Sequence, residues 1–190
     1  MGLAYYRVTP DVLDELRPLI AAHEAELVGP RARGYWTERP DVYDYEGVQA
    51  TARQLDLAGK AKAVEQFELS EVQAHSLSQL NIELPNDGGE FPPALFLSSV
   101  SPDGLRRQLR IARRRLGEDP DLVASHLVQR ENDPRFAAYL DKQIRLLREA
   151  LPLVWHFYER AADAGNGILV VDLRARDLEI PDEVELISAD

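Results

Sequence analysis

Six arginines and no acidic residue lie within residues 105–116, which gives this short segment a charge of +6. Guanidinium groups donate planar, bidentate hydrogen bonds that match carboxylates and phosphates, so the segment has the chemistry to hold an anion. In a helix, its apolar side chains fall within about 60° and five arginines cover about 120° of the opposite flank. The pattern predicts a helix with an exposed arginine stripe, ended by Gly117. The candidate binding residues are Arg106, Arg107, Arg110, Arg113 and Arg114.

The rest of the chain is strongly acidic. Among its 190 residues, 22 are Lys or Arg and 33 are Asp or Glu, and removing the +6 of residues 105–116 from the net charge of −11 leaves −17. Two interpretations stay open: the stripe binds an acidic protein partner or an anionic small molecule, or carboxylates of the same chain neutralise it. The acidic remainder repels phosphates, so neither a nucleic acid nor a membrane is expected as a partner.

A second candidate binding region is the segment 34–45, which is rich in aromatic residues and carries several charges. Aromatic side chains offer a large contact area at a small entropic cost, as binding hot spots do. The alternative is that this long loop folds back and covers one end of the core. The candidate binding residues here are Tyr35, Trp36, Arg39, Tyr43 and Tyr45.

Side chains suited to acid–base catalysis are present but dispersed. In an enzyme acting on a phosphorylated or anionic small molecule, Asp41, Asp44 or His156 would be the acid–base and arginines would clamp the anion. The four histidines are far apart in the sequence, and the chain has no cysteine and no nucleophile elbow. We therefore predict no catalytic residue, no metal site and no cofactor, and keep the enzyme as the alternative function.

Four helix starts share a capping side chain followed by proline. The capping oxygen accepts a free backbone amide, and proline has no amide to leave unsatisfied. The four starts are Thr9-Pro10, Ser101-Pro102, Asp119-Pro120 and Asp133-Pro134. From Pro10, apolar spacings of three and four predict a helix to about Leu27. Its buried face is predicted to be Val12, Leu16, Leu19, His23 and Leu27, with His23 as a core residue rather than a base.

The longest helix is predicted to begin at Pro134. Its apolar residues form two adjacent faces, which is typical of a central helix buried by neighbours on both sides. One face is Leu140, Ile144, Leu147, Leu151, Val154, Tyr158 and Ala161, and the second adds Leu146, Leu153 and Phe157. Pro152 removes a backbone hydrogen bond inside this pattern, so we expect a kink or break there.

Short strands are expected at both ends of the chain. Residues 3–8 and the apolar run 168–171 are predicted to be strands that pair with each other. The fold class that follows is α+β: a mainly helical single domain spanning residues 1–190, with a small sheet joining the N-terminal strand to a C-terminal strand after the long central helix. Residues 174–190 form either its end or an extension.

The middle of the chain gives weaker predictions. The alternation at 80–84 and the residues 91–99 predict two strands that flank a turn at 86–89. Helices are predicted at 48–57 and, after the capping pair Ser70 and Gln73, at 71–80. A loop is predicted at 29–47.

Motifs at the two ends of the chain carry a family resemblance. They are Met1-Gly2 with Tyr6-Arg7-Val8-Thr9-Pro10-Asp11, and Phe157-Tyr158-Glu159-Arg160-Ala161-Ala162 leading through Gly165 and Gly167 into Ile168-Leu169-Val170-Val171. Together they resemble the YfbM-like family of small bacterial proteins. The chain departs from that family near Lys60, where a Lys-Trp pair is missing, and beyond Leu173. The resemblance implies an α+β domain, and it assigns no catalytic residues because the family has no established activity.

The sequence favours a cytoplasmic location. The first residues lack the basic and apolar regions of a signal peptide, and no apolar run approaches the roughly 20 residues that span a bilayer. The functional hypothesis is a non-catalytic binding protein of the immunity or adaptor type that engages its partner through the arginine helix, the aromatic loop or both.

Overall fold

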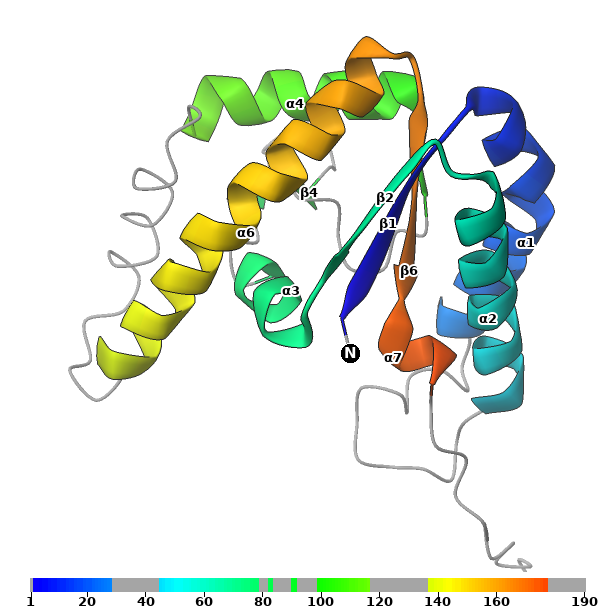
Figure 1. Cartoon of the computed structure of the whole chain (residues 1–190), viewed down its shortest axis with the longest axis horizontal. Helices are drawn as coiled ribbons and strands as arrows, with labels where there is room; N and C mark the ends of the chain where they lie inside the picture. The colour runs from blue at the N-terminus through cyan, green and yellow to red at the C-terminus, as the bar shows by residue number, and fades with distance from the viewer. Residues whose placement is uncertain are drawn as a thin grey trace, which may run out of the picture.

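A four-stranded antiparallel sheet forms the centre of the protein (Figure 1). The computed structural model describes residues 2–28, 45–78, 82–83, 90–91, 99–116 and 137–177. The strand order is β2-β1-β6-β5. The strands are β1 (Leu3–Val8), β2 (Glu65–Leu69), β5 (Ser99–Val100) and β6 (Gly167–Asp172). Tyr5 of β1 pairs with Val170 of β6 on one side and with Phe67 of β2 on the other. The predicted pairing of the two chain ends is therefore confirmed, and with it the α+β class.

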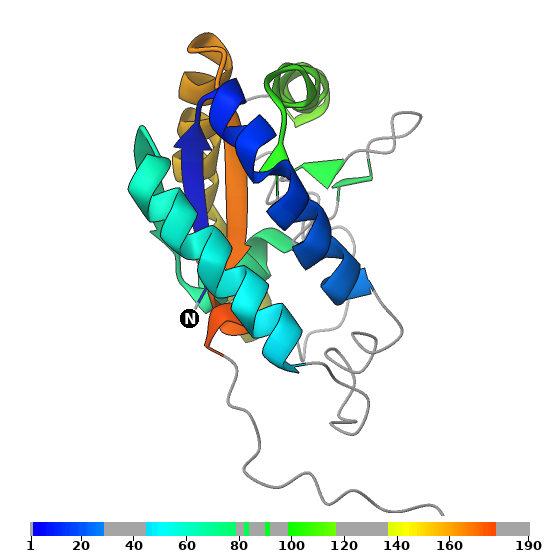
Figure 2. The ribbon, with the colours of Figure 1, turned by 90° about the vertical axis from the view of Figure 1, so that its right-hand side faces the viewer.

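Helices cover both faces of this sheet. Helices α1 (Pro10–Val28) and α2 (Tyr45–Lys62) lie side by side on one face, as Figure 2 shows. Helices α3 (Glu71–Ser78), α4 (Pro102–Leu116) and α6 (Ala137–Asp163) lie on the other face (Figure 1). A last short helix, α7 (Leu173–Arg176), follows β6 and packs against α2.

The two layers of helices produce two hydrophobic cores, one on each face of the sheet. Alternate residues of a strand point to opposite faces, so β1 sends Ala4, Tyr6 and Val8 towards α1 and α2, and Leu3 and Tyr5 towards α4 and α6. All six residues of β6 are buried. A strand buried on both faces is a continuous apolar run, which is why Ile168-Leu169-Val170-Val171 stands out in the sequence.

The helix starts that depend on local capping were predicted correctly. Helix α1 begins at Pro10 and α4 at Pro102, where the amide of Gly104 donates to the Ser101 hydroxyl over 3.2 Å. At α3, the Gln73 amide donates to the Ser70 hydroxyl over 3.3 Å and the Ser70 amide donates back to the Gln73 side chain over 3.1 Å. This is a complete capping box. The starts at 119–120 and 133–134 lie outside the described residues.

Predictions for the segment between α1 and α3 were wrong in two respects. Helix α2 begins at Tyr45 and runs to Lys62, so it is longer than the predicted 48–57 and takes Tyr45 and Gly47 out of the predicted loop. The strand β2 was missed. Its signal is short, because only two of its five residues, Phe67 and Leu69, are apolar.

Helix α6 also differs from its prediction. It continues through Pro152 without a break, and Leu153 remains 53% exposed. Among the described elements it packs on α3, α4 and β6, so its second apolar face is only partly covered: Phe157 is buried, whereas Leu153 is exposed.

Two smaller expectations need correction. The buried face of α1 is formed by Leu13, Leu16, Ile20 and His23, with Val12 and Leu19 only partly buried beside it. The second strand predicted at 91–99 is divided between two sheets: β4 (Glu90–Phe91) pairs with β3 (Ile82–Glu83), whereas β5 pairs with β6. Of the predicted end or extension at 174–190, residues 178–190 lie outside the described residues.

Candidate functional site

A pocket of about 440 Å³ lies between α4 and the C-terminal part of α6, which cross at one end of the sheet (Figure 1). Its lining residues are Arg106, Leu109, Arg110 and Arg113 from α4, with Glu159, Ala162 and Asp163 from α6. On both helices these positions are separated by three or four residues, so each set lies on one helix face. The crossing therefore brings three arginines of the predicted stripe onto one concave surface with two carboxylates.

Two of these arginines are ion-paired within the protein. Arg106 Nη1 lies 3.1 Å from Asp103 Oδ1, and Arg113 Nη2 pairs with Glu159 Oε1. Arg107 also has an interaction within the chain. Arg110 is exposed and forms no ion pair with any residue that the structure describes. Among the residues that the structure describes, neutralisation by the chain's own acids, the alternative interpretation of the stripe, thus applies to Arg106 and Arg113 but not to Arg110.

The Glu159 carboxylate in the pocket wall is held by three side-chain contacts. Its Oε1 accepts a hydrogen bond from Trp155 Nε1 over 3.0 Å in addition to the Arg113 contact, and Oε2 lies 3.3 Å from His156 Nδ1. Burial acts to raise the pKa of Glu159, but the hydrogen bonds from Arg113, His156 and Trp155 outweigh it and hold the pKa below the ordinary glutamate value. Glu159 is therefore ionised at neutral pH and holds Arg113 in place.

The structure places the remaining predicted residues as follows. His156 is exposed on α6 and contacts Glu159 from outside the pocket lining. Arg114 lies on α4 and Tyr45 on α2, but their side chains are outside the described set. The residues Tyr35, Trp36, Arg39, Asp41, Tyr43 and Asp44 also lie outside it. The convergence of Asp41, Asp44 and His156 that the enzyme alternative needs is thus untested.

The pocket contains acidic residues that sequence reasoning missed. Glu159 and Asp163 were not singled out, although they are spaced four apart on the predicted long helix. That spacing is a usable signal for a shared helix face. The sequence carries no comparable signal that this face meets α4.

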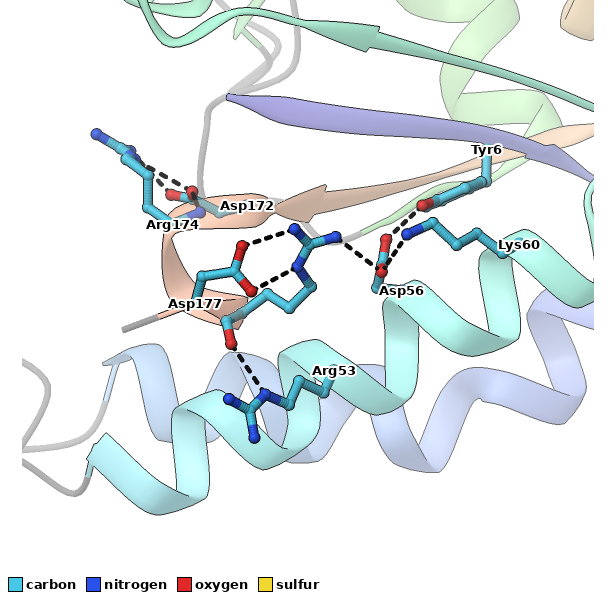
Figure 3. A network of polar contacts seen from close by, with 8 residues as sticks. Tyr6, Arg53, Asp56, Lys60, Asp172, Arg174 and Asp177 are labelled. Atoms are coloured by element: carbon cyan, nitrogen blue, oxygen red, sulfur yellow. Dashed lines mark hydrogen bonds and ion pairs between the residues drawn. The ribbon is translucent and has the colours of Figure 1, made fainter. Parts of the chain in front are cut away.

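A second polar cluster, also missed, lies on the opposite face of the sheet (Figure 3). Asp56 of α2 is only 3% exposed. Its Oδ1 accepts a hydrogen bond from the Tyr6 hydroxyl, and its Oδ2 lies 2.7 Å from Lys60 Nζ and 3.1 Å from Arg176 Nη1. Arg176 in turn pairs with Asp177 over 2.6 Å. The cluster therefore connects β1, α2 and α7 through one carboxylate.

The contacts of this second cluster stabilise the fold. Burial raises the pKa of Asp56, but the hydrogen bonds from Lys60, Tyr6 and Arg176 reverse the effect, so its pKa is below the ordinary aspartate value. Burial and the bond to Asp56 both raise the pKa of Tyr6. Both oxygens of Asp56 have donors, which leaves a stable ionised carboxylate rather than a proton donor. The sequence signal was an aspartate between two leucines, Leu55 and Leu57.

His23 is the buried histidine of the α1–α2 packing. It is 1% exposed, and its Nδ1 lies 2.8 Å from the Thr51 hydroxyl. That hydroxyl is itself within 3.0 Å of the Gly47 carbonyl and 3.1 Å of the Val48 carbonyl, one of which takes its proton. With the hydroxyl proton donated to a carbonyl, Thr51 accepts from the tautomer of the neutral imidazole that carries its proton on Nδ1. Burial lowers the pKa of His23 to about 4, and the charge of Asp172 opposes this only in part.

We expect acid to destabilise the protein through His23. Its folded pKa, about 4, lies below the ordinary histidine value of 6.5, so the unfolded chain binds the proton more tightly. The stability that neutral His23 contributes is complete above pH 6.5 and is lost as the pH falls towards 4, by about 3 kcal/mol. Urea denaturation between pH 7 and 4 measures this loss. His23→Asn should be less stable at pH 7 but lose less stability over the same range, and an identical pH dependence in both proteins would contradict the assignment.

Comparisons with known proteins identified no relative of this chain. A scan against protein-family models and searches of curated proteins and of solved structures each matched nothing. In the described ranges, no three His, Asp or Glu side chains gather as metal ligands. No helix in the part of the chain that the structure describes is long and apolar enough to cross a membrane.

Proposed function

We propose that this protein is a non-catalytic binding protein of the immunity or adaptor type, which recognises an acidic segment of a partner protein through the pocket between α4 and α6. The observation that carries the proposal is Arg110. Its guanidinium group lines the pocket, is exposed to solvent and has no ion pair among the described residues, whereas the neighbouring Arg106 and Arg113 are each paired. A carboxylate from outside is the group that complements it.

The surroundings of Arg110 favour such a contact. Arg106 and Arg113 lie one helical turn on either side of it, so an incoming carboxylate meets additional positive charge. Although Arg106 and Arg113 are each ion-paired, about half of each arginine side chain is accessible to solvent. The pair of Arg106 with Asp103 is exposed on both sides and therefore weak, so an acidic partner group competes for Arg106 at little cost. The charge contrast with the rest of the chain orients an acidic partner towards this face.

The types of residue in the pocket favour binding over chemistry. The lining consists of arginines, carboxylates, a leucine and an alanine, and Glu159 is held ionised by its three donors. Arginine stays protonated at physiological pH and an ionised glutamate cannot deliver a proton, so neither is suited to general acid catalysis. An enzyme acting on an anionic small molecule is the second candidate, and the observation in its favour is the contact of His156 with Glu159.

The test is the affinity for a defined acidic probe. We expect a fluorescein-labelled oligoglutamate peptide to bind the wild-type protein at low salt and Arg110→Glu about tenfold more weakly, because a charge-assisted contact becomes a repulsion. Fluorescence anisotropy measures both affinities. The melting temperature should not change, because Arg110 makes no ion pair within the described residues.

Arg145→Glu is the matched control. Arg145 is exposed on α6 and lies 14 residues before Glu159, a distance of about 21 Å along the helix. The substitution changes the net charge by the same amount, so it reports the nonspecific electrostatic contribution. Equal weakening by the two substitutions, or no binding of the peptide to the wild-type protein, would rule out the proposed site.

Three further assignments are part of the same proposal. We place the protein in the cytoplasm, we propose the YfbM-like family as its family on the motifs at the chain ends, and we propose the aromatic segment 34–45 as a second contact region. Replacing Trp36 in the peptide assay tests the contribution of that segment.

A further inference from the structure

The pocket between α4 and α6 presents two uncompensated charges of opposite sign. Arg110 on α4 and Asp163 on α6 both line it, both are exposed, and neither forms an ion pair with any residue that the structure describes. The other charged lining residues, Arg106, Arg113 and Glu159, already have partners of opposite charge. A purely anionic ligand would satisfy Arg110 and leave Asp163 beside it without a counter-charge.

The position of Asp163 makes a cationic partner favourable. Asp163 is the last residue of α6, where the carbonyl end of the helix carries partial negative charge. A carboxylate at this position repels the helix dipole, and a bound cation relieves that repulsion. The two uncharged lining residues, Leu109 and Ala162, are apolar and directly precede Arg110 and Asp163 in the sequence. An aliphatic link between an anionic and a cationic group would contact these apolar residues.

We infer that the group bound in the pocket is amphoteric: its carboxylate pairs with Arg110, its ammonium group pairs with Asp163, and an aliphatic chain joins the two. This inference rests on the proposed function, because it specifies the partner group that the same site recognises. The acidic segment of the partner protein therefore carries a basic side chain next to the acidic one.

The test uses a series of ω-amino acids from β-alanine to 6-aminohexanoate. Each is compared with the plain carboxylate of the same chain length, which lacks only the ammonium group. Affinities are measured by titrating the amide resonances of ¹⁵N-labelled full-length protein. We expect one chain length to bind about threefold more tightly than its matching carboxylate, since a solvent-exposed ion pair contributes about that much. The best length reports the separation of Arg110 and Asp163.

Two variants assign the contacts. Asp163→Asn should remove the advantage of the amino acid without weakening the binding of the plain carboxylate, because a repelling charge is removed, whereas Arg110→Gln should weaken both. Asp141→Asn is the matched control, because Asp141 is exposed near the other end of the same helix. The inference is overturned if no chain length shows the advantage, or if the advantage survives in Asp163→Asn. Failure of the proposed function is seen separately, as loss of oligoglutamate binding to the wild-type protein.

Discussion

Asp56→Ala should lower the free energy of unfolding by about 3 kcal/mol. The substitution removes the one carboxylate that accepts hydrogen bonds from Tyr6, Lys60 and Arg176, and leaves the buried Tyr6 hydroxyl without that acceptor. Breaking a buried ion pair by deleting one partner typically costs 3–5 kcal/mol, and we take the lower end (about 3 kcal/mol) because Lys60 is partly exposed and can be rehydrated. Urea denaturation at pH 7 measures the loss.

Asp14→Ala is the control for this experiment. Asp14 also lies on a helix and pairs with an arginine, Arg17, but both side chains are largely exposed. We expect a change of about 0.5 kcal/mol at most, as for other exposed ion pairs. If Asp56→Ala changed stability as little as Asp14→Ala, the cluster in Figure 3 would not hold α2 and α7 to the sheet.

Phe157→Ala should be at least as damaging, with a loss of about 3–5 kcal/mol. Phe157 is fully buried on α6, and its ring meets that of Phe67 edge-on at a centroid distance of 4.7 Å. Phe67 in turn stacks on Tyr5 of β1 at 4.7 Å. Truncation would leave a cavity between α6 and two strands, because the surrounding backbone is fixed by the sheet. Thermal or urea denaturation measures the loss.

Leu153→Ala provides the matched comparison. Leu153 lies one helical turn before Phe157 on the same helix and is 53% exposed. Alanine has a high helix propensity, so the substitution keeps the propensity of the helix high. Truncation of Leu153 should cost about 0.5 kcal/mol, in the range of surface substitutions. Similar losses for the two variants would contradict the placement of α6, because the sequence alone assigned both residues to the same apolar face.

The two cores divide the molecule into parts that can be tested separately. The Asp56 cluster and His23 belong to the layer of α1 and α2, and the pocket belongs to the layer of α4 and α6. Residues in different layers share no contacts that we describe, so their effects on stability should be additive. Variants of Arg110 and Asp163 therefore report binding without the stability changes expected at Asp56.

The sequence by itself determined the features that depend on neighbouring residues. The strand at 3–8, the starts of α1, α3 and α4 and the strand after α6 follow from capping side chains, prolines and a continuous apolar run, all of which act over a few residues. The arginine stripe was also visible, because helical periodicity is local. The pairing of the two chain ends needed one more argument, the burial of an apolar strand on both faces.

Only the tertiary structure decided which faces meet. The strand β2 has only two apolar residues, and its pairing with β1 is a contact between distant segments that no local pattern encodes. The apolar pattern of α6 could not show that Phe157 would be buried and Leu153 exposed, since that depends on the sheet beneath one side of the helix. Likewise, Arg113 is paired because α4 crosses α6 at Glu159, a contact between residues 46 positions apart that no local pattern encodes, whereas the pair of Arg106 with Asp103 lies within α4.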